Sequence, residues 1–283
     1  MAKVRAALIV LFSLLLLFPT YWMLAGSLQP ISGVLRLPPN LVPRAVTVGN
    51  YVALFKHNPI SRWALNTVAL GGLSVIGAVG TAAVAGYAFS AFHMPVCIWW
   101  AFIVTLMVPR VAIVIPQFAV FHGLRLAGGW VGVFLPLLYY PTGILLFRVH
   151  ADGMPKSLRD AARIDGASEG QIFTRIVLPL ATPVIGILVI GKAFEALGDY
   201  LWQSLILTGR EEMTLIVGLV AATGRRQEIS VNPIGVTLAA GILMMAPMLV
   251  VFLVFHIFAH SYISADTPHS WPWSPSFFYR PSQ

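Results

Sequence analysis

The sequence has few charges and almost no cysteine. Only 10% of its 283 residues are Asp, Glu, Lys or Arg, whereas a soluble domain carries about 25%. Hydrophobic residues make up 58%, and the mean hydropathy is +0.83. Charge is absent altogether from four long runs, which are residues 6–35, 63–109, 176–191 and 229–265. These runs offer water no polar face, which excludes an ordinary soluble core, and apolar runs of about 18 residues or more predict transmembrane helices.

The single cysteine and the positive net charge further limit which class of protein this chain can be. Cys97 stands alone, so this chain has no internal disulfide. The net charge is +8 and the sequence pI is about 10.0. A net positive charge of this size in a soluble protein suggests nucleic-acid binding. Here, however, the basic residues lie mainly in short connecting segments, where membrane topology and contact with anionic lipid explain them. We expect membrane lipid, and no nucleic acid, as a partner.

The apolar runs predict an all-α, polytopic membrane protein with six transmembrane helices. The expected spans are residues 4–26, 63–89, 95–121, 129–149, 180–207 and 234–260. The second span is rich in small residues, which allow close helix packing in lipid and predict a central position. Pro109 and Pro116 interrupt the third. We divide the chain into residues 1–62, a transmembrane domain at 63–260, and a Ser-, Pro- and Trp-rich tail at 261–283, read as a loop or disordered segment.

An even number of spans places both termini on one side of the membrane. The basic residues of the connecting segments divide equally, eight to each side. Lys3 and Arg5 flank the first span, which often dominates orientation, so the positive-inside rule favours cytoplasmic termini.

The charged segment at 150–179 between the fourth and fifth spans predicts two short helices. Pro155 suits the first position of a helix, and Gly166 suits the left-handed position just after a helix end. Ser168 with Gln171 three residues later matches a capping box, which begins a second helix. Ala161 and Ala162 leave a low face beside Leu158. Such a face suits a groove on another protein or a lipid surface, and spacing alone leaves both open.

A spaced motif in this segment resembles a known family. Asp160-Ala161-Ala162, three residues, Gly166, nine residues and Ile176-x-Leu178-Pro179 resembles the EAA loop of permease subunits in ABC importers, with Asp in place of the usual Glu. The chain is similar to the maltose and glycerol-phosphate permeases of carbohydrate-type importers. Its Ser-, Pro- and Trp-rich tail departs from that family, which usually ends in a basic, Gly-rich segment.

The resemblance implies a mechanism and a set of partners. The EAA loop of such permeases docks onto a cytoplasmic ATPase dimer that binds ATP and Mg, so this chain is expected to hold no cofactor. Asp160, Ala161, Ala162 and Gly166 would form the docking element, with Leu158 on its face. Ile176, Leu178 and Pro179 would join it to the fifth span. A second permease subunit and an extracytoplasmic solute-binding protein complete the expected assembly, which lies in the cytoplasmic membrane.

Four charged residues lie within the expected spans away from the span ends. Lys192, Glu195 and Asp199 lie along one face of the fifth span, and Arg110 follows Pro109 in the third. Buried charges in a membrane are costly and need partners. They form either a structural ion-pair cluster or a polar stripe on the translocation path, and Arg110 either lines that path or pairs with Glu195 or Asp199.

Two further patterns are weak. The G-x-x-x-x-G-K at 186–192 resembles a phosphate-binding loop, but it lies in an apolar run and Ala193 follows it, so we expect no nucleotide site. His256 and His260 have metal-ligand spacing without further ligands nearby, and we expect no metal. No catalytic cluster is visible, so a transport subunit is expected rather than an enzyme. The alternative is a stand-alone secondary transporter or channel, for which inverted repeats are expected and not found.

Overall fold

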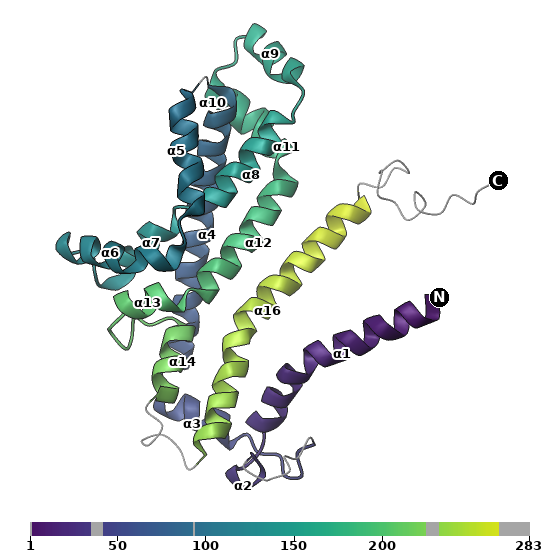
Figure 1. The fold of residues 1–283 in the computed structure, drawn as a ribbon, viewed down its shortest axis with the longest axis vertical. Helices are drawn as coiled ribbons and strands as arrows, with labels where there is room; N and C mark the ends of the chain where they lie inside the picture. The colour runs from purple at the N-terminus through teal and green to yellow at the C-terminus, as the bar shows by residue number, and fades with distance from the viewer. Residues whose placement is uncertain (1, 35–41, 93, 225–231, 266–283) are drawn as a thin grey trace.

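The structure is a computed structural model that describes residues 2–34, 42–92, 94–224 and 232–265, and these are helical with no β-strand. The helices, labelled as in Figure 1, are α1 (Ala2–Ser27), α2 (Ile31–Val34), α3 (Gly49–His57), α4 (Ile60–Ala91), α5 (Val96–Met107), α6 (Arg110–Gly123), α7 (Gly129–Leu137), α8 (Pro141–Asp152), α9 (Lys156–Ile164), α10 (Glu169–Ile172), the π-helix η1 (Phe173–Val177), α11 (Leu178–Leu180), α12 (Thr182–Gly198), α13 (Tyr200–Ile206), α14 (Leu215–Gly224) and α16 (Pro233–Ala265).

The fold confirms an all-α polytopic membrane protein. Four stretches are long and apolar enough to cross a membrane, namely Lys3–Ser27, Ile60–Ala91, Gly129–Asp152 and Pro233–Ile257. Two bent helix pairs bring the number to six if each pair counts as one span: α5 with α6, and α10 to α11 with α12. The number of spans among the described residues is therefore four to six.

The bend in the third expected span comes from Pro109. Val108 is extended, and the axes of α5 and α6 differ by 102° across the break. Proline has no N–H to donate and forces the residue before it out of helical geometry, so the helix ends there. Pro116, also expected to interrupt this span, lies inside α6 without ending it.

Helix α4 is the centre of the molecule, as its small residues predict. It lies against α8 and α12 (Figure 1), with a buried apolar core between them that includes Val79, Phe147 and Leu188. At Gly86 the backbone of α8 comes so close that an added Cβ would lie 2.8 Å from the carbonyl oxygen of Ile144. This glycine is what allows α4 and α8 to pack backbone against backbone.

The outer helices leave apolar surface uncovered. Helix α1 contacts α16 and is otherwise exposed except at its last turn, where Ser27 bonds to α3, and α5 buries none of its residues, including Cys97. The α9–α10 pair lies at one end of the molecule, and α2, α3 and α14 lie at the other (Figure 1). Helix α1 runs towards the α2–α3 end and α16 runs away from it, so the start of α1 and the end of α16 face the α9 side.

Two expectations for loops need correction. The segment 208–233, which the expected spans leave as a connecting loop, contains the short helix α14, whose Leu215, Leu219 and Ala222 pack in a core with Trp63. Helix α14 is too short to be predicted as a transmembrane span, and the charged residues just before it make the segment polar as a whole. Helix α16 also continues to Ala265, five residues into the expected tail, and 266–283 lie outside the described residues.

Candidate functional site

The first part of the candidate site is helix α9, which ends as the sequence predicts. Gly166 takes φ +81°, a left-handed conformation. The amide of Ala167 donates to the carbonyl of Ala162 at 2.9 Å, and that of Gly166 donates to Arg163 at 3.0 Å. Together they form a Schellman motif, in which glycine supplies the conformation that other residues avoid.

The second helix of the pair also begins as predicted. Ser168 caps α10, its hydroxyl accepting from the Gln171 amide while the Gln171 side chain accepts from the Ser168 amide at 2.8 Å. The helix then widens into the π-turn η1. This turn lies directly before Pro179, whose ring crowds the carbonyl four residues earlier in a regular helix. The chain bends by 78° at Ala181, two residues after Pro179, and enters α12.

The predicted docking residues lie on two faces. Leu158, Asp160 and Ala161 are exposed on α9, and Gly166 is exposed just beyond it. Ala162 is half-buried and packs on the core around Phe147. Of the predicted joining residues, Leu178 packs on that same core, Ile176 is half-buried and Pro179 is exposed.

A residue that the motif does not include anchors α9. The side chain of Arg159 is buried, with 7% exposed, and its Nη1 donates to the hydroxyl of Ser90 at 3.2 Å. Ser90 lies in the last turn of α4. A buried guanidinium needs such a partner, so this contact fixes the inner face of α9 on the end of α4.

A second anchor centres on Glu169. Its carboxylate accepts a hydrogen bond from the Tyr87 hydroxyl on α4 at 2.7 Å and another from Arg163 Nε at 2.8 Å. Arg163 also contacts Asp160 at 3.2 Å. Its hydrogen bond to Glu169 raises the pKa of the Arg163 guanidinium above its ordinary value. Sequence reasoning missed Tyr87 because 82 residues separate it from Glu169.

The second part of the candidate site is a row of four alternating charges. Arg110 donates through Nη1 to Glu195 at 2.7 Å and through Nη2 to Asp199 at 2.8 Å. Lys192 Nζ lies 3.1 Å from the other oxygen of Glu195, in an ion pair that lacks hydrogen-bond geometry. The row Lys192, Glu195, Arg110, Asp199 thus has no net charge. Arg110 pairs with both carboxylates, where the sequence left open which one it would choose.

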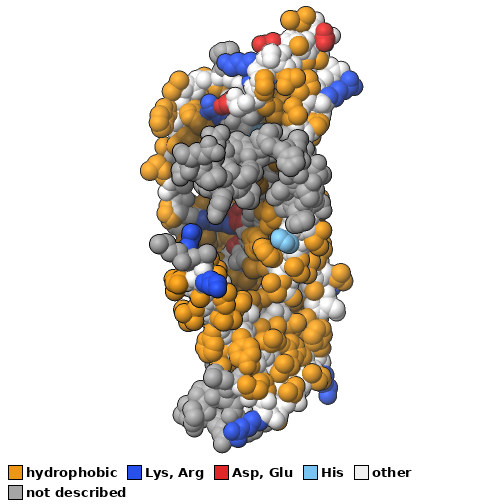
Figure 2. All heavy atoms as spheres, turned by 90° about the vertical axis from the view of Figure 1, so that its right-hand side faces the viewer, with side chains coloured by type: hydrophobic (Ala, Val, Ile, Leu, Met, Phe, Trp, Pro, Cys, Tyr) orange, Lys and Arg blue, Asp and Glu red, His pale blue; other side chains and the backbone are white. Residues whose placement is uncertain are grey.

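The four side chains of this charge row differ in how deeply they are buried. Lys192 is completely buried, with its Nζ 5.1 Å from the centre of the Tyr140 ring, and the Asp199 side chain is 8% exposed. The side chains of Arg110 and Glu195 are 40% and 34% exposed. Both ends of the row are therefore buried in protein, while its middle is accessible. Figure 2 shows acidic and basic side chains together at mid-height on an otherwise largely apolar face.

Three helix interruptions meet at this row. Arg110 begins α6 just after the break at Pro109, Asp199 separates α12 from α13, and Tyr140 precedes the first residue of α8. Asp199 also accepts from the Trp202 amide at 3.4 Å, which caps α13. The charges therefore tie together the points where the helices break.

The glycine-rich stretch 186–192 and both histidines lie on helices. The stretch 186–192 lies inside α12, where its amides serve the helix. The described part of the chain contains no group of three or more His, Cys, Asp or Glu side chains placed to hold a metal. The His260 side chain lies outside the described residues.

The fold and site define a multi-pass permease subunit, with spanning helices around a mid-height charge row and an exposed helix pair at one end. Residues 94–263 match the family described as "Binding-protein-dependent transport system inner membrane component", and the chain belongs to that family. Its members are transport subunits, which supports an importer over a stand-alone transporter or channel.

Relatives span nearly the whole chain. The arabinooligosaccharides permease protein AraQ of Bacillus subtilis is 31% identical over 259 residues, covering 89% of this chain and 91% of AraQ. The trehalose permease protein SugB of Mycobacterium tuberculosis is 29% identical over 244 residues, covering 84% and 87%. The sn-glycerol-3-phosphate permease protein UgpE of Escherichia coli K12 is 25% identical over 261 residues, covering 89% and 92%.

The fold matches a solved structure as well. A chain of a bacterial ABC transporter involved in the import of the acidic polysaccharide alginate superposes with a TM-score of 0.78 at 21% identity, covering 91% of this chain and 95% of that one. The likeness supports the helical arrangement described above.

Proposed function

We propose that this chain is a transmembrane subunit of an ATP-driven importer for a sugar or sugar-like solute, coupled to a separate ATPase through α9. The observation that carries the proposal is the construction of α9, which presents exposed small and apolar side chains on a base held firmly to the bundle. Family membership and the sugar-transporting relatives support it.

The exposed face of α9 suits a protein groove. Ala161 keeps the face low, while Leu158 and Ile164 are 44% and 86% exposed. Apolar side chains this exposed on a nine-residue helix gain by burial in a partner. The partner proposed is the ATPase dimer, which would bind ATP and Mg, and Asp160 and Gly166 would lie at the edges of the contact. In this arrangement α9 and both termini are cytoplasmic.

Two routes would carry a movement of α9 into the bundle. One runs along the chain through η1, α11 and the bend at Ala181 into α12. The other crosses directly to α4 through Arg159 with Ser90 and through Glu169 with Tyr87. Since α4 packs backbone to backbone on α8, the second route would move α4 and α8 together.

The charge row is proposed to line the translocation path. A sugar offers hydroxyl groups, for which carboxylate oxygens are acceptors and guanidinium N–H groups are donors. Arg110 and Glu195 are partly exposed and present both kinds of group. Buried Lys192 would orient Glu195, and Asp199 would hold Arg110. A second permease subunit would close the path, and an extracytoplasmic solute-binding protein would deliver the solute.

Purification with the proteins encoded beside it tests the proposal. We expect an ATPase to copurify, and the complex to import a radiolabelled sugar into vesicles only with ATP. Gly166→Asp should reduce that import, because it adds negative charge beside the docking face. If no ATPase copurifies and Gly166→Asp leaves uptake intact, the importer proposal fails.

A further inference from the structure

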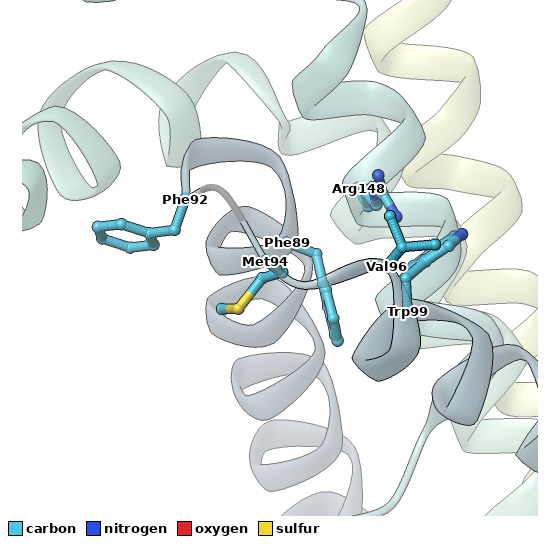
Figure 3. Close-up of a pocket in the computed structure, with 6 residues that line it drawn as sticks. All are labelled: Phe89, Phe92, Met94, Val96, Trp99 and Arg148. Carbon is cyan, nitrogen blue, oxygen red and sulfur yellow. The ribbon is translucent and has the colours of Figure 1, made fainter.

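A small cavity lies where α4 ends and α5 begins, beside the end of α4 that anchors α9, but it shares no lining residue with the candidate site. It has a volume of about 160 Å³ and is lined by Phe89, Phe92, Met94, Val96, Trp99 and Arg148 (Figure 3). A cavity of roughly 150 Å³ holds a group the size of benzene, so this one has room for a phosphate group. It lies towards the end of the molecule that carries α9 (Figure 1).

The basic residue of this cavity lacks an acceptor. Nη1 of Arg148 is buried and has no hydrogen-bond partner, while the side chain as a whole is 26% exposed. Its only ion pair is through Nε, 3.4 Å from Asp152, among the described residues. A buried N–H without a partner costs free energy, so the arrangement calls for an acceptor that the chain itself does not supply.

Aromatic contacts fix the orientation of the Arg148 guanidinium. Its carbon lies 3.6 Å from the centre of the Trp99 ring, a cation–π stack that fixes the plane of the group. Phe89 packs against Trp99 at 5.4 Å between ring centres and supports it. A fixed, planar guanidinium matches the paired oxygens of a phosphate better than a flexible ammonium does.

The rim of the cavity has the character of a membrane interface. Phe92, Met94 and Val96 are exposed, at 51%, 40% and 70%. Acyl chains would lie against such side chains, while Arg148, four residues before the end of α8, sits where headgroups lie. Basic pockets between helices on the cytoplasmic side of a membrane bind anionic headgroups.

We propose that this cavity binds the phosphodiester of an anionic glycerophospholipid, with the accessible part of the Arg148 guanidinium donating to a phosphate oxygen and Trp99 holding the guanidinium in place. The acyl chains would lie across Phe92, Met94 and Val96. The proposal is independent of the transported solute and of the ATPase.

Native mass spectrometry of the purified full chain tests this site. We expect phosphatidylglycerol to be retained over phosphatidylcholine, and Arg148→Gln to reduce retention of phosphatidylglycerol about tenfold, the effect of losing one charge-assisted hydrogen bond. Arg148→Lys should recover part of the binding, and Trp99→Leu should weaken it.

Arg175→Gln is the matched control, because it removes an exposed arginine near the same end of the molecule without touching the cavity. Equal losses in Arg175→Gln and Arg148→Gln would overturn the proposal, as would unchanged retention in Arg148→Gln. Inorganic phosphate is tested in detergent, and displacement of the lipid by millimolar phosphate would show a free-anion site instead. Thermal unfolding without lipid checks that Arg148→Gln folds, and if it does not, Arg148→Lys and Trp99→Leu decide the outcome.

Discussion

At the scale of single residues, the features best predicted from sequence are those set by local backbone chemistry. Gly166 occupies the left-handed position predicted for it, and Ser168 forms its capping box. Both depend only on neighbours a few residues away, which a sequence displays directly. The pairing of Arg110 with Glu195 and Asp199 depends on the angles at two helix breaks, one before α6 and one after α12. The sequence therefore predicts which residues take part but not how they pair.

The left-handed backbone of Gly166 leads to a graded prediction. An added Cβ would meet nothing within 4 Å, so only the backbone conformation opposes substitution. Gly166→Asn, which tolerates this conformation, should retain most uptake, whereas Gly166→Val should lose most of it through about 1–2 kcal/mol of local strain. Vesicle uptake measures both variants, and equal activity of the two would contradict the assigned role of the conformation.

The burial of Lys192 leads to an asymmetric prediction. Lys192→Met should fold normally, because Glu195 keeps Arg110 as a partner. Glu195→Gln leaves a buried ammonium without its counter-charge, and unpaired buried charges cost about 3–5 kcal/mol. We expect a clear fall in thermal unfolding temperature for Glu195→Gln only. If Lys192→Met folds but abolishes uptake, Lys192 acts in transport and is more than a structural pair.

At the scale of helices, the contact between α4 and α8 explains the small residues of the second expected span. We expect Gly86→Ala to lower stability by about 1–3 kcal/mol, because its Cβ would also lie 2.9 Å from Phe147 Cβ and 3.0 Å from Arg148 N. Gly80→Ala on the same helix is the control, since nothing lies within 4 Å of that position. Equal unfolding temperatures for the two variants would refute this packing.

The contact between α4 and α10 yields a prediction about coupling. Tyr87→Phe removes the hydroxyl that donates to Glu169, and we expect more ATP to be hydrolysed per solute imported while the ATPase still copurifies. Thr174→Ala, exposed in η1, serves as control and should leave that ratio unchanged. Should Tyr87→Phe also leave it unchanged, the contact between Tyr87 and Glu169 does not carry movement into the bundle.

Helix α14 shows why some elements escape prediction. Its ten residues are apolar on all sides, but such a length fits a loop, a strand or a helix equally well. Its helical state is set by contacts with α16 and with α4, and α4 lies far away in sequence. One close approach is at Gly218, where an added Cβ would overlap the Trp63 ring.

At the scale of the whole molecule, the exposed apolar surface indicates an assembly. Helix α1 has none of its hydrophobic window buried, and α16 has only 11%. Lipid covers part of such surface, and the proposed second permease would cover more. Because a partner that binds only the folded state stabilises it, the assembled complex should unfold several degrees above the isolated chain in the same detergent. Identical unfolding temperatures would argue against a subunit contact on these helices.

The lone cysteine offers an experimental handle on this assembly. Cys97 is exposed on α5, between the cavity residues Val96 and Trp99. A thiol-reactive fluorophore or nitroxide would therefore attach at a single position in the unaltered chain. Its emission or line shape would report directly whether the corner between α4 and α5 moves during the transport cycle, without first removing other cysteines.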